Sequence, residues 1–268
     1  MRSGLLCGRE HVKIGAVAAL AEGRCAIALS RGGYAKGYAH RDPNEDAAAF
    51  AFGADGTLLA VADGHGGHEA AELALAVLLT RFAEAWTDAR PLGPAWLAQA
   101  REALELLHTE LVGSGSQGGN PDARTTLALA LARPAEDLLL FASVGDSHVF
   151  AASAADATEL AHPGDPTPAY LGSPALAPAE LAARAVIGST PLSGTQALAL
   201  ATDGLSEHGI GVVAPRAALL EVLARAECAS PDVRPLELAR GIVDCALAAH
   251  RQQRAGDNVA AAVLVLPL

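Results

Sequence analysis

Residues 47–67 read AAAFAFGADGTLLAVADGHGG. Two short apolar runs, Ala47 to Phe52 and Thr57 to Ala62, are separated by Gly53-Ala54-Asp55-Gly56. An Asp-Gly pair between two apolar runs is typical of a β-hairpin turn. The second run ends at Asp63-Gly64-His65-Gly66-Gly67, and the residues that follow are rich in alanine, leucine and glutamate, which predicts a helix. The stretch therefore predicts two antiparallel strands, the second of which leads through a glycine-rich turn into a helix.

The same two kinds of segment make up most of the remaining chain. Further strands are predicted at Arg24 to Ser30, Thr125 to Ala132, Asp137 to Val144, His148 to Ala152, Gln196 to Thr202 and Asn258 to Leu266. Helices are predicted at His68 to Asp88, Pro94 to Val112, Pro215 to Ala226 and Pro235 to Arg254. The strands come in groups instead of alternating singly with helices, which disfavours a doubly wound parallel sheet. Two antiparallel sheets packed together, with helix pairs outside, would bury this pattern.

Two segments lack such periodicity. Gly113 to Pro121, GSGSQGGNP, is predicted to be a flexible loop. His162 to Pro191 contains six prolines and is predicted to be an irregular surface insertion. Neither an internal repeat nor a linker divides the sequence, so we expect a single domain over residues 1–268.

Composition excludes several classes of protein. Hydrophobic residues make up 51% of the chain, which excludes a disordered protein. The net charge of -11 argues against nucleic-acid binding, which needs a basic surface. No run approaches the roughly 20 apolar residues of a membrane span, and charged residues interrupt the N-terminus. The cysteines contain no CxxC pair that would suggest a zinc site. We therefore expect a cytoplasmic protein that binds neither membrane nor nucleic acid.

Acidic residues gather where the predicted strands meet loops. The four clusters are Asn44-Glu45-Asp46, Asp63-Gly64, Asp203-Gly204 and Gly256-Asp257-Asn258. Any one of them, taken alone, is better explained as a turn or a solvated loop. Hard divalent cations such as Mg²⁺ and Mn²⁺ prefer carboxylate ligands, and two such ions can share and activate a water molecule. It is the joint occurrence of the four clusters that suggests a two-metal site.

In chain order these clusters and their neighbours resemble the motifs of the metal-dependent protein phosphatases (PPM, or type 2C), in their bacterial-like single-domain form. The resemblance covers about residues 31–266, and DGHGG together with NED and a terminal GDN is specific as a set. It is carried by RDPNED at 41–46, VADGHGG at 61–67, SVGDS at 143–147, ATDGL at 201–205 and GDNV at 256–259. It implies a four-layer αββα sandwich of the α+β class.

The resemblance also implies roles for individual residues. Asp46, Asp63, Asp203, Asp257 and the Gly64 carbonyl would bind two Mn²⁺ or Mg²⁺ ions. Glu45 would reach a metal ion through water, Asn258 would orient the ligands, and Asp146 would help to hold a third, weaker ion. Arg41 would bind the substrate phosphate, since a guanidinium suits bidentate phosphate binding. His65 would protonate the leaving oxygen of serine or threonine; the alternative is a histidine that only makes hydrogen bonds.

The implied activity is hydrolysis of phosphoserine and phosphothreonine by direct attack of a metal-activated water. The implied partners are phosphorylated proteins, the targets of a serine/threonine kinase, and the implied state is a monomer. Three features depart from the family pattern: His148 replaces the arginine that usually follows GDS, the glycine usual before Thr125 is missing, and the insertion at 162–191 is short.

Two alternatives remain at this point. A phosphatase-like module could bind phosphoproteins without hydrolysing them, but all four ligand aspartates are present. A GDS-type serine esterase would use Ser147, yet no histidine follows His250 to complete a base partner near the C-terminus.

Overall fold

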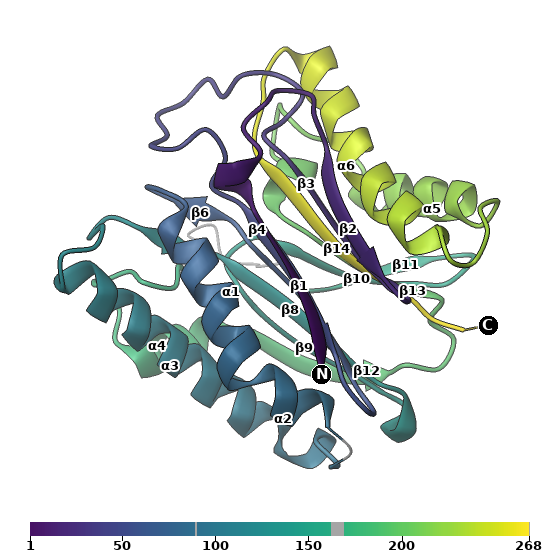
Figure 1. Ribbon diagram of the computed structural model, residues 1–268, viewed down its shortest axis with the longest axis horizontal. Coiled ribbons are helices and arrows are strands. Elements are labelled where there is room, and N and C mark those ends of the chain that lie inside the picture. The colour runs from purple at the N-terminus through teal and green to yellow at the C-terminus, as the bar shows by residue number, and fades with distance from the viewer. Residues whose placement is uncertain (89, 162–168, 268) are drawn as a thin grey trace.

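The computed structural model describes residues 1–88, 90–161 and 169–267. Within them the chain forms four layers, in which two six-stranded sheets lie face to face and helices cover both outer faces (Figure 1). All strand pairings in the two sheets are antiparallel. The predicted αββα sandwich is confirmed.

The first sheet has the strand order β1-β4-β5-β8-β9-β12. Its strands are β1 (Arg2–Cys7), β4 (Ala47–Phe52), β5 (Thr57–Ala62), β8 (Leu127–Arg133), β9 (Leu138–Val144) and β12 (Val186–Pro191). The helices α1 (Glu69–Arg81), α2 (Ala83–Thr87), α3 (Trp96–Ser116) and α4 (Pro178–Arg184) lie on its outer side (Figure 1).

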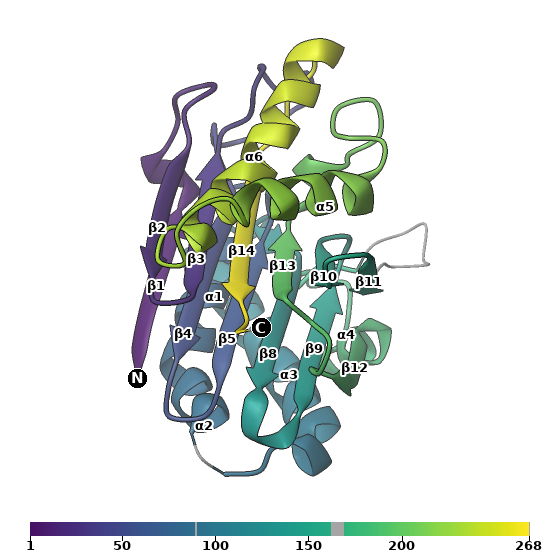
Figure 2. The same cartoon turned by 90° about the vertical axis from the view of Figure 1, so that its right-hand side faces the viewer.

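The second sheet has the order β11-β10-β13-β14-β3-β2. Its strands are β2 (Ala18–Glu22), β3 (Cys25–Ser30), β10 (His148–Ala152), β11 (Ala157–Ala161), β13 (Ala197–Ala201) and β14 (Val259–Val265). The helices α5 (Pro215–Ala226) and α6 (Arg234–Gln253) cover its outer face and stand in front of β13 and β14 in Figure 2. A small additional pair joins β6 (Gly64–His65) to β7 (Arg124–Thr125).

Alternation along the strands produces three apolar layers, one between the sheets and one beneath each set of helices. Between the sheets, large side chains of one strand face small ones of the other. Strand β14, with Ala260 and Ala262, lies across from β5, with Leu59 and Val61. In the same way β13, which carries Leu198 and Leu200, lies across from the inward-facing alanines of β8. This alternation of large and small residues lets the sheets pack closely.

Some expectations from the sequence were wrong. The predicted helix at 68–88 is interrupted at Phe82, whose φ of -120° is not helical. Helix α3 continues to Ser116, so residues 113–116 of the loop predicted at 113–121 are helical, although their two glycines and two serines have low helix propensity. The strands β1, β2, β11 and β12 had not been predicted from their short, weakly alternating sequences.

The predicted irregular insertion at 162–191 also needs correction. Residues 162–168 of this prediction lie outside the described residues. The remainder contains helix α4, with Pro178 in its first turn, and the edge strand β12. Pro191 is accommodated because β12 pairs with β9 alone, and an edge strand can lack a donor on its outer side.

Candidate metal centre

The four predicted ligand aspartates lie at one end of the sandwich. Asp46 immediately precedes β4, and Asp63 immediately follows β5, its hairpin partner in the first sheet. In the second sheet Asp203 follows β13 and Asp257 precedes β14, its antiparallel neighbour. Because neighbouring strands run in opposite directions, the end of one and the start of the next meet at the same edge of a sheet.

Two side chains join the sheets at this end. The hydroxyl of Thr202 donates to Asp46 Oδ2 at 2.7 Å, and the amide oxygen of Asn258 accepts from the Glu45 backbone N–H at 2.9 Å. The Asn258 amide nitrogen also donates to the carbonyls of Arg31 and Pro43. Asn258 thus fixes the loop before β4 against the start of β14.

Glycines allow the turns of the site to approach one another. A Cβ on Gly204 would lie 1.7 Å from the Asn258 carbonyl oxygen, and one on Gly64 would lie 2.5 Å from that of Glu45. The turn 203–205, a short 3₁₀ helix (η4, Asp203–Leu205), can therefore pack on β14 only because residue 204 has no side chain.

Three carboxylates come within reach of one cation. Ligand oxygens of Asp63, Asp146 and Asp203 all lie within 4.8 Å of one another. Burial, followed by the repulsion of neighbouring carboxylates, raises the pKa of both Asp63 and Asp203 well above the usual value. Such a crowded and buried acidic group fits a divalent cation, which would relieve the repulsion.

Asp46 lies beside this group and supports the same interpretation. The carboxylate is 1% exposed, and its Oδ1 is buried without a hydrogen-bond partner among the described residues. Burial raises the pKa of Asp46 to about 7, in spite of Lys36 and the hydrogen bond from Thr202, which lower it. A buried carboxylate oxygen with no donor is expected where a metal ion binds.

The structure places His65 close to these carboxylates. Its Nε2 is 3.3 Å from Asp63 Oδ2, and its ring meets Tyr170 edge to face with centroids 4.6 Å apart. Burial, with smaller contributions from Arg124 and Lys36, lowers the pKa of His65 to about 4. The imidazole is therefore neutral near pH 7 in the absence of substrate and metal.

Arg41 and Glu45 take different positions. The Arg41 side chain is 55% exposed and its guanidinium is 4.0 Å from Glu69 Oε1, beside a hollow of about 370 Å³ that residues 114–115 and 118–121 also line. Glu45 is buried, and its Oε1 accepts the backbone N–H groups of Arg41 and Asp42. Arg41 thus stands at the rim of the site, whereas Glu45 lies within it.

Several neighbours of the site were not predicted from the sequence. The Lys36 ammonium is 3.2 Å from Asp257 Oδ1, and the Tyr38 hydroxyl donates to the same oxygen. On the other side the Arg124 guanidinium lies over the Tyr170 ring, 5.1 Å from its centroid. No motif marks these four positions, although the charges of Lys36 and Arg124 could have singled them out near the acidic clusters.

His148, where the family pattern has arginine, connects two elements of the second sheet. Its Nε2 is 2.6 Å from Ser206 Oγ and its Nδ1 is 2.6 Å from Glu159 Oε1. Ser206 directly follows the turn that carries Asp203. His148 therefore connects this turn to β11. His68, at the start of α1, is also bound to a carboxylate, that of Asp42 at 2.8 Å.

Ser147 does not have the surroundings of an esterase nucleophile. It is fully buried, and its hydroxyl is 2.9 Å from that of Thr126. A substrate could not reach it without local unfolding, so the esterase alternative receives no support.

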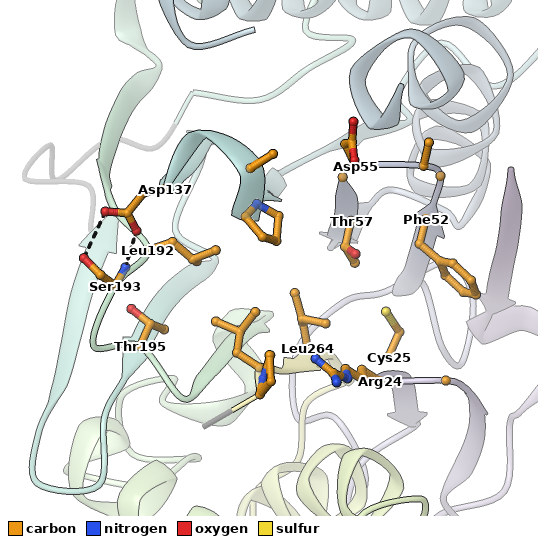
Figure 3. Close-up of a pocket in the computed structure, with 18 of the residues that line it drawn as sticks. Arg24, Cys25, Phe52, Asp55, Thr57, Asp137, Leu192, Ser193, Thr195 and Leu264 are labelled. Atoms are coloured by element: carbon orange, nitrogen blue, oxygen red, sulfur yellow. Dashed lines mark hydrogen bonds between the residues drawn. The ribbon is translucent and has the colours of Figure 1, made fainter. Parts of the chain in front are cut away.

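Another hollow, shown in Figure 3, lies at the opposite end of the sandwich. A strand of six residues, roughly 20 Å long, separates it from the aspartates. Its volume is about 590 Å³, and it is lined by the β4–β5 turn, the end of β14 and residues 192–195. Its Asp137 carboxylate is already bound by the Ser193 backbone N–H and hydroxyl.

A profile of the protein phosphatase 2C family matches residues 36–236. The chain therefore belongs to the protein phosphatase 2C family, and the predicted class of enzyme, a protein serine/threonine phosphatase, is confirmed. Among curated protein sequences, none matches this chain significantly.

Solved structures agree with this fold. A bacterial serine phosphatase superposes with a TM-score of 0.67 at 17% identity, covering 92% of this chain and 98% of that one. Stp1 of Staphylococcus aureus gives 0.65 at 17% identity, over 96% and 98% of the two chains. The catalytic domain of PstP, solved with two manganese ions, gives 0.63 at 20% identity, over 94% and 100%.

Proposed function

We propose that this chain hydrolyses phosphoserine and phosphothreonine in proteins, by direct attack of water on phosphorus at a two-metal site. The observation that carries the proposal is the convergence of Asp63, Asp146 and Asp203 within 4.8 Å, next to the donor-free Oδ1 of Asp46. Bound Mg²⁺ or Mn²⁺ would lower the pKa of a water molecule and neutralise charge on the phosphoryl group. The Gly64 carbonyl and Asp257 complete the proposed ligand set, and Asp146 would also serve a third, weaker ion.

The remaining roles follow from the positions of the side chains. Arg41, exposed at the rim, can turn from Glu69 toward the phosphate of an arriving substrate. His65 is neutral in the free protein, so it can donate a proton to the leaving oxygen only after the phosphate dianion has raised its pKa. Buried Glu45 and Asn258 hold the loop before β4, which carries Asp46, in place.

Family membership supports phosphoproteins as substrates, and we expect them to be products of a serine/threonine kinase. The monomeric state and the cytoplasmic location stay predictions, and size-exclusion chromatography with light scattering tests the first. In the described part of the chain, every helix is too short or too polar to cross a bilayer.

The decisive experiment is phosphate release by EDTA-stripped protein from p-nitrophenyl phosphate and from a phosphothreonine peptide. We expect no release without metal, recovery with Mn²⁺ or Mg²⁺, and a loss of at least about 100-fold in Asp63→Asn. Asp232→Asn, an exposed aspartate in the turn before α6, is the matched control and should retain activity.

No release with any divalent ion, from protein shown to be folded, would contradict the proposal and favour the non-catalytic binding module. Detection of a covalent phosphoenzyme during turnover would contradict the direct attack of water while leaving the phosphatase activity in place.

A further inference from the structure

A single lysine side chain is buried in the acidic end of the sandwich. The chain has lysine at positions 13 and 36 only, and the side chain of Lys36 is just 4% exposed. Its ammonium lies 3.2 Å from Asp257 Oδ1 and 3.8 Å from Glu45 Oε2. Lysine is seldom buried unless its charge is compensated, so these two carboxylates account for its position.

Asp257 Oδ1 has no capacity left for another partner. Besides Lys36, the Tyr38 hydroxyl and the Asn258 backbone N–H both donate to this one oxygen, the latter at 2.7 Å. A carboxylate oxygen has two lone pairs, so three donors saturate it. A cation that binds through this oxygen must first displace one of them.

Of the three donors, Lys36 alone carries a positive charge, so an arriving cation repels it most strongly. It lies between Ala35 and Gly37, which are both exposed, on a stretch without helix or strand. The Asn258 N–H, in contrast, belongs to the backbone directly before β14. Rotation of the lysine side chain would carry its ammonium into water without disturbing either sheet.

The two halves of the site therefore differ in charge. The Asp63, Asp146 and Asp203 oxygens lie within 4.8 Å of one another, whereas the ammonium of Lys36 is ion-paired with Asp257 and Glu45. The half that contains Asp257 and Glu45 already holds one positive charge. A divalent ion bound by Asp63 and Asp203 would not have to displace the ammonium from its ion pairs, but one bound by Asp257 and Glu45 would compete with it.

We propose that Lys36 is an internal cation of the metal-free site and competes with one of the two divalent ions for Asp257 and Glu45. The inference rests on the proposed function, since it concerns the same metal centre. It follows that the two ions bind with unequal affinity, and that binding of the weaker one releases Lys36 into solvent.

Lysine acetylation of the wild-type protein tests the release directly. Protein is treated with an amine-reactive acetyl ester in EDTA and at increasing Mg²⁺, and the two lysines are followed by peptide mass spectrometry. We expect Lys36 to react slowly in EDTA and about tenfold faster at saturating Mg²⁺. Lys13, which is exposed, is the internal reference and should change little. Continued protection of Lys36 at saturating Mg²⁺ would overturn the inference.

Mn²⁺ titration calorimetry of Lys36→Met tests the competition, with Lys13→Met as the matched control. Without the competing charge, the weaker of the two dissociation constants should fall roughly tenfold, while that of the control stays unchanged. The metal-free Lys36→Met protein should also melt at a lower temperature, because its carboxylates have lost their counter-charge, and Mg²⁺ should restore it.

The possible failures are distinguishable. Two-site binding that is equal in wild type and Lys36→Met, or weaker in the variant, overturns the inference and leaves the proposed function intact. Absence of Mn²⁺ binding by folded wild-type protein overturns the proposed function and the inference together. Should Lys36→Met fail to fold, the acetylation experiment, which needs no variant, still decides.

Discussion

The Thr202 hydroxyl donates a hydrogen bond of 2.7 Å to Asp46 Oδ2 and accepts one of 2.8 Å from the Ala260 backbone N–H. Thr202 directly follows β13 of the second sheet, whereas Asp46 precedes β4 in the first. One fully buried hydroxyl thus ties a proposed metal ligand to the opposite sheet.

Thr202→Val should remove this tie while keeping the shape of the side chain. Both the Asp46 oxygen and the Ala260 N–H would lose a buried partner, which costs about 1–3 kcal/mol of unfolding free energy. Urea unfolding in EDTA measures the loss. Thr158→Val, at an exposed position of β11, is the control and should change stability by less than about 0.5 kcal/mol. Equal stability of the two variants would show that the hydroxyl contributes nothing.

The stability of the metal-free protein should fall as the pH rises from about 6.5 to 8. The pKa of Asp46 is raised to about 7, and those of Asp63 and Asp203 are also raised well above their usual value, so the folded state holds protons that the unfolded state has released. The lowered pKa values of His65 and His250 act in the opposite sense, but only below their ordinary value of about 6.5.

Thermal unfolding at several pH values, in EDTA and in Mg²⁺, checks this expectation. Each fully titrating carboxyl contributes up to about 1.4 kcal/mol per pH unit in the window. Bound Mg²⁺ should abolish the decline because it stabilises the ionised carboxylates. A metal-free stability that rises from pH 6.5 to 8 would contradict the assignment of these buried groups.

We expect the aromatic ring of Tyr170, and not its hydroxyl, to contribute to kcat/KM. The ring contacts the His65 imidazole edge to face and carries the Arg124 guanidinium on its face. Tyr170→Phe retains both contacts, so kcat/KM should stay within about twofold. Tyr170→Leu frees both partners, and we expect a loss of about tenfold, in keeping with roughly 1 kcal/mol for an aromatic contact. Phosphopeptide assays compare the two, and equal losses would show that the hydroxyl carries the effect.

His148→Ala should impair turnover by loosening the turn that carries Asp203. It disconnects Ser206, next to the Asp203 turn, from Glu159 on β11. We expect kcat to fall about tenfold with KM little changed, because a displaced metal ligand affects the reaction more than substrate binding. Ser206→Ala should reproduce part of this loss. A raised KM with normal kcat would place His148 in substrate binding instead.

The acidic clusters could be predicted from the sequence because each stands at the end of an apolar run. Asp63 after β5 and Asp257 before β14 are the clearest cases, since strand direction alone brings them to one edge. The hairpin of β4 and β5 was equally evident from its Asp-Gly turn. Predictions of this kind depend only on the local sequence and hold for any order of the antiparallel strands.

Other features depend on contacts that no local pattern reveals. Lys36 lies in an irregular stretch, and only the folded chain brings it to Asp257, 221 positions further on. The edge strand β12 has a proline and mixed polarity, and its pairing with β9 overrides its weak propensity. The helical residues 113–116 are likewise maintained by the long helix that precedes them.

The apolar layer between the two sheets sets the distance between the aspartates of the proposed metal site. Asp46 and Asp63 adjoin strands of one sheet, and Asp203 and Asp257 adjoin strands of the other. Small residues such as Ala260 and Ala262 set the distance between the two sheets. A leucine at position 262 would wedge the sheets apart and lengthen the distances between carboxylates that it never touches. The affinity for metal should therefore depend on the size of the side chains in this distant layer. Alanines that take no part in the chemistry would in this way set the distances between the carboxylates.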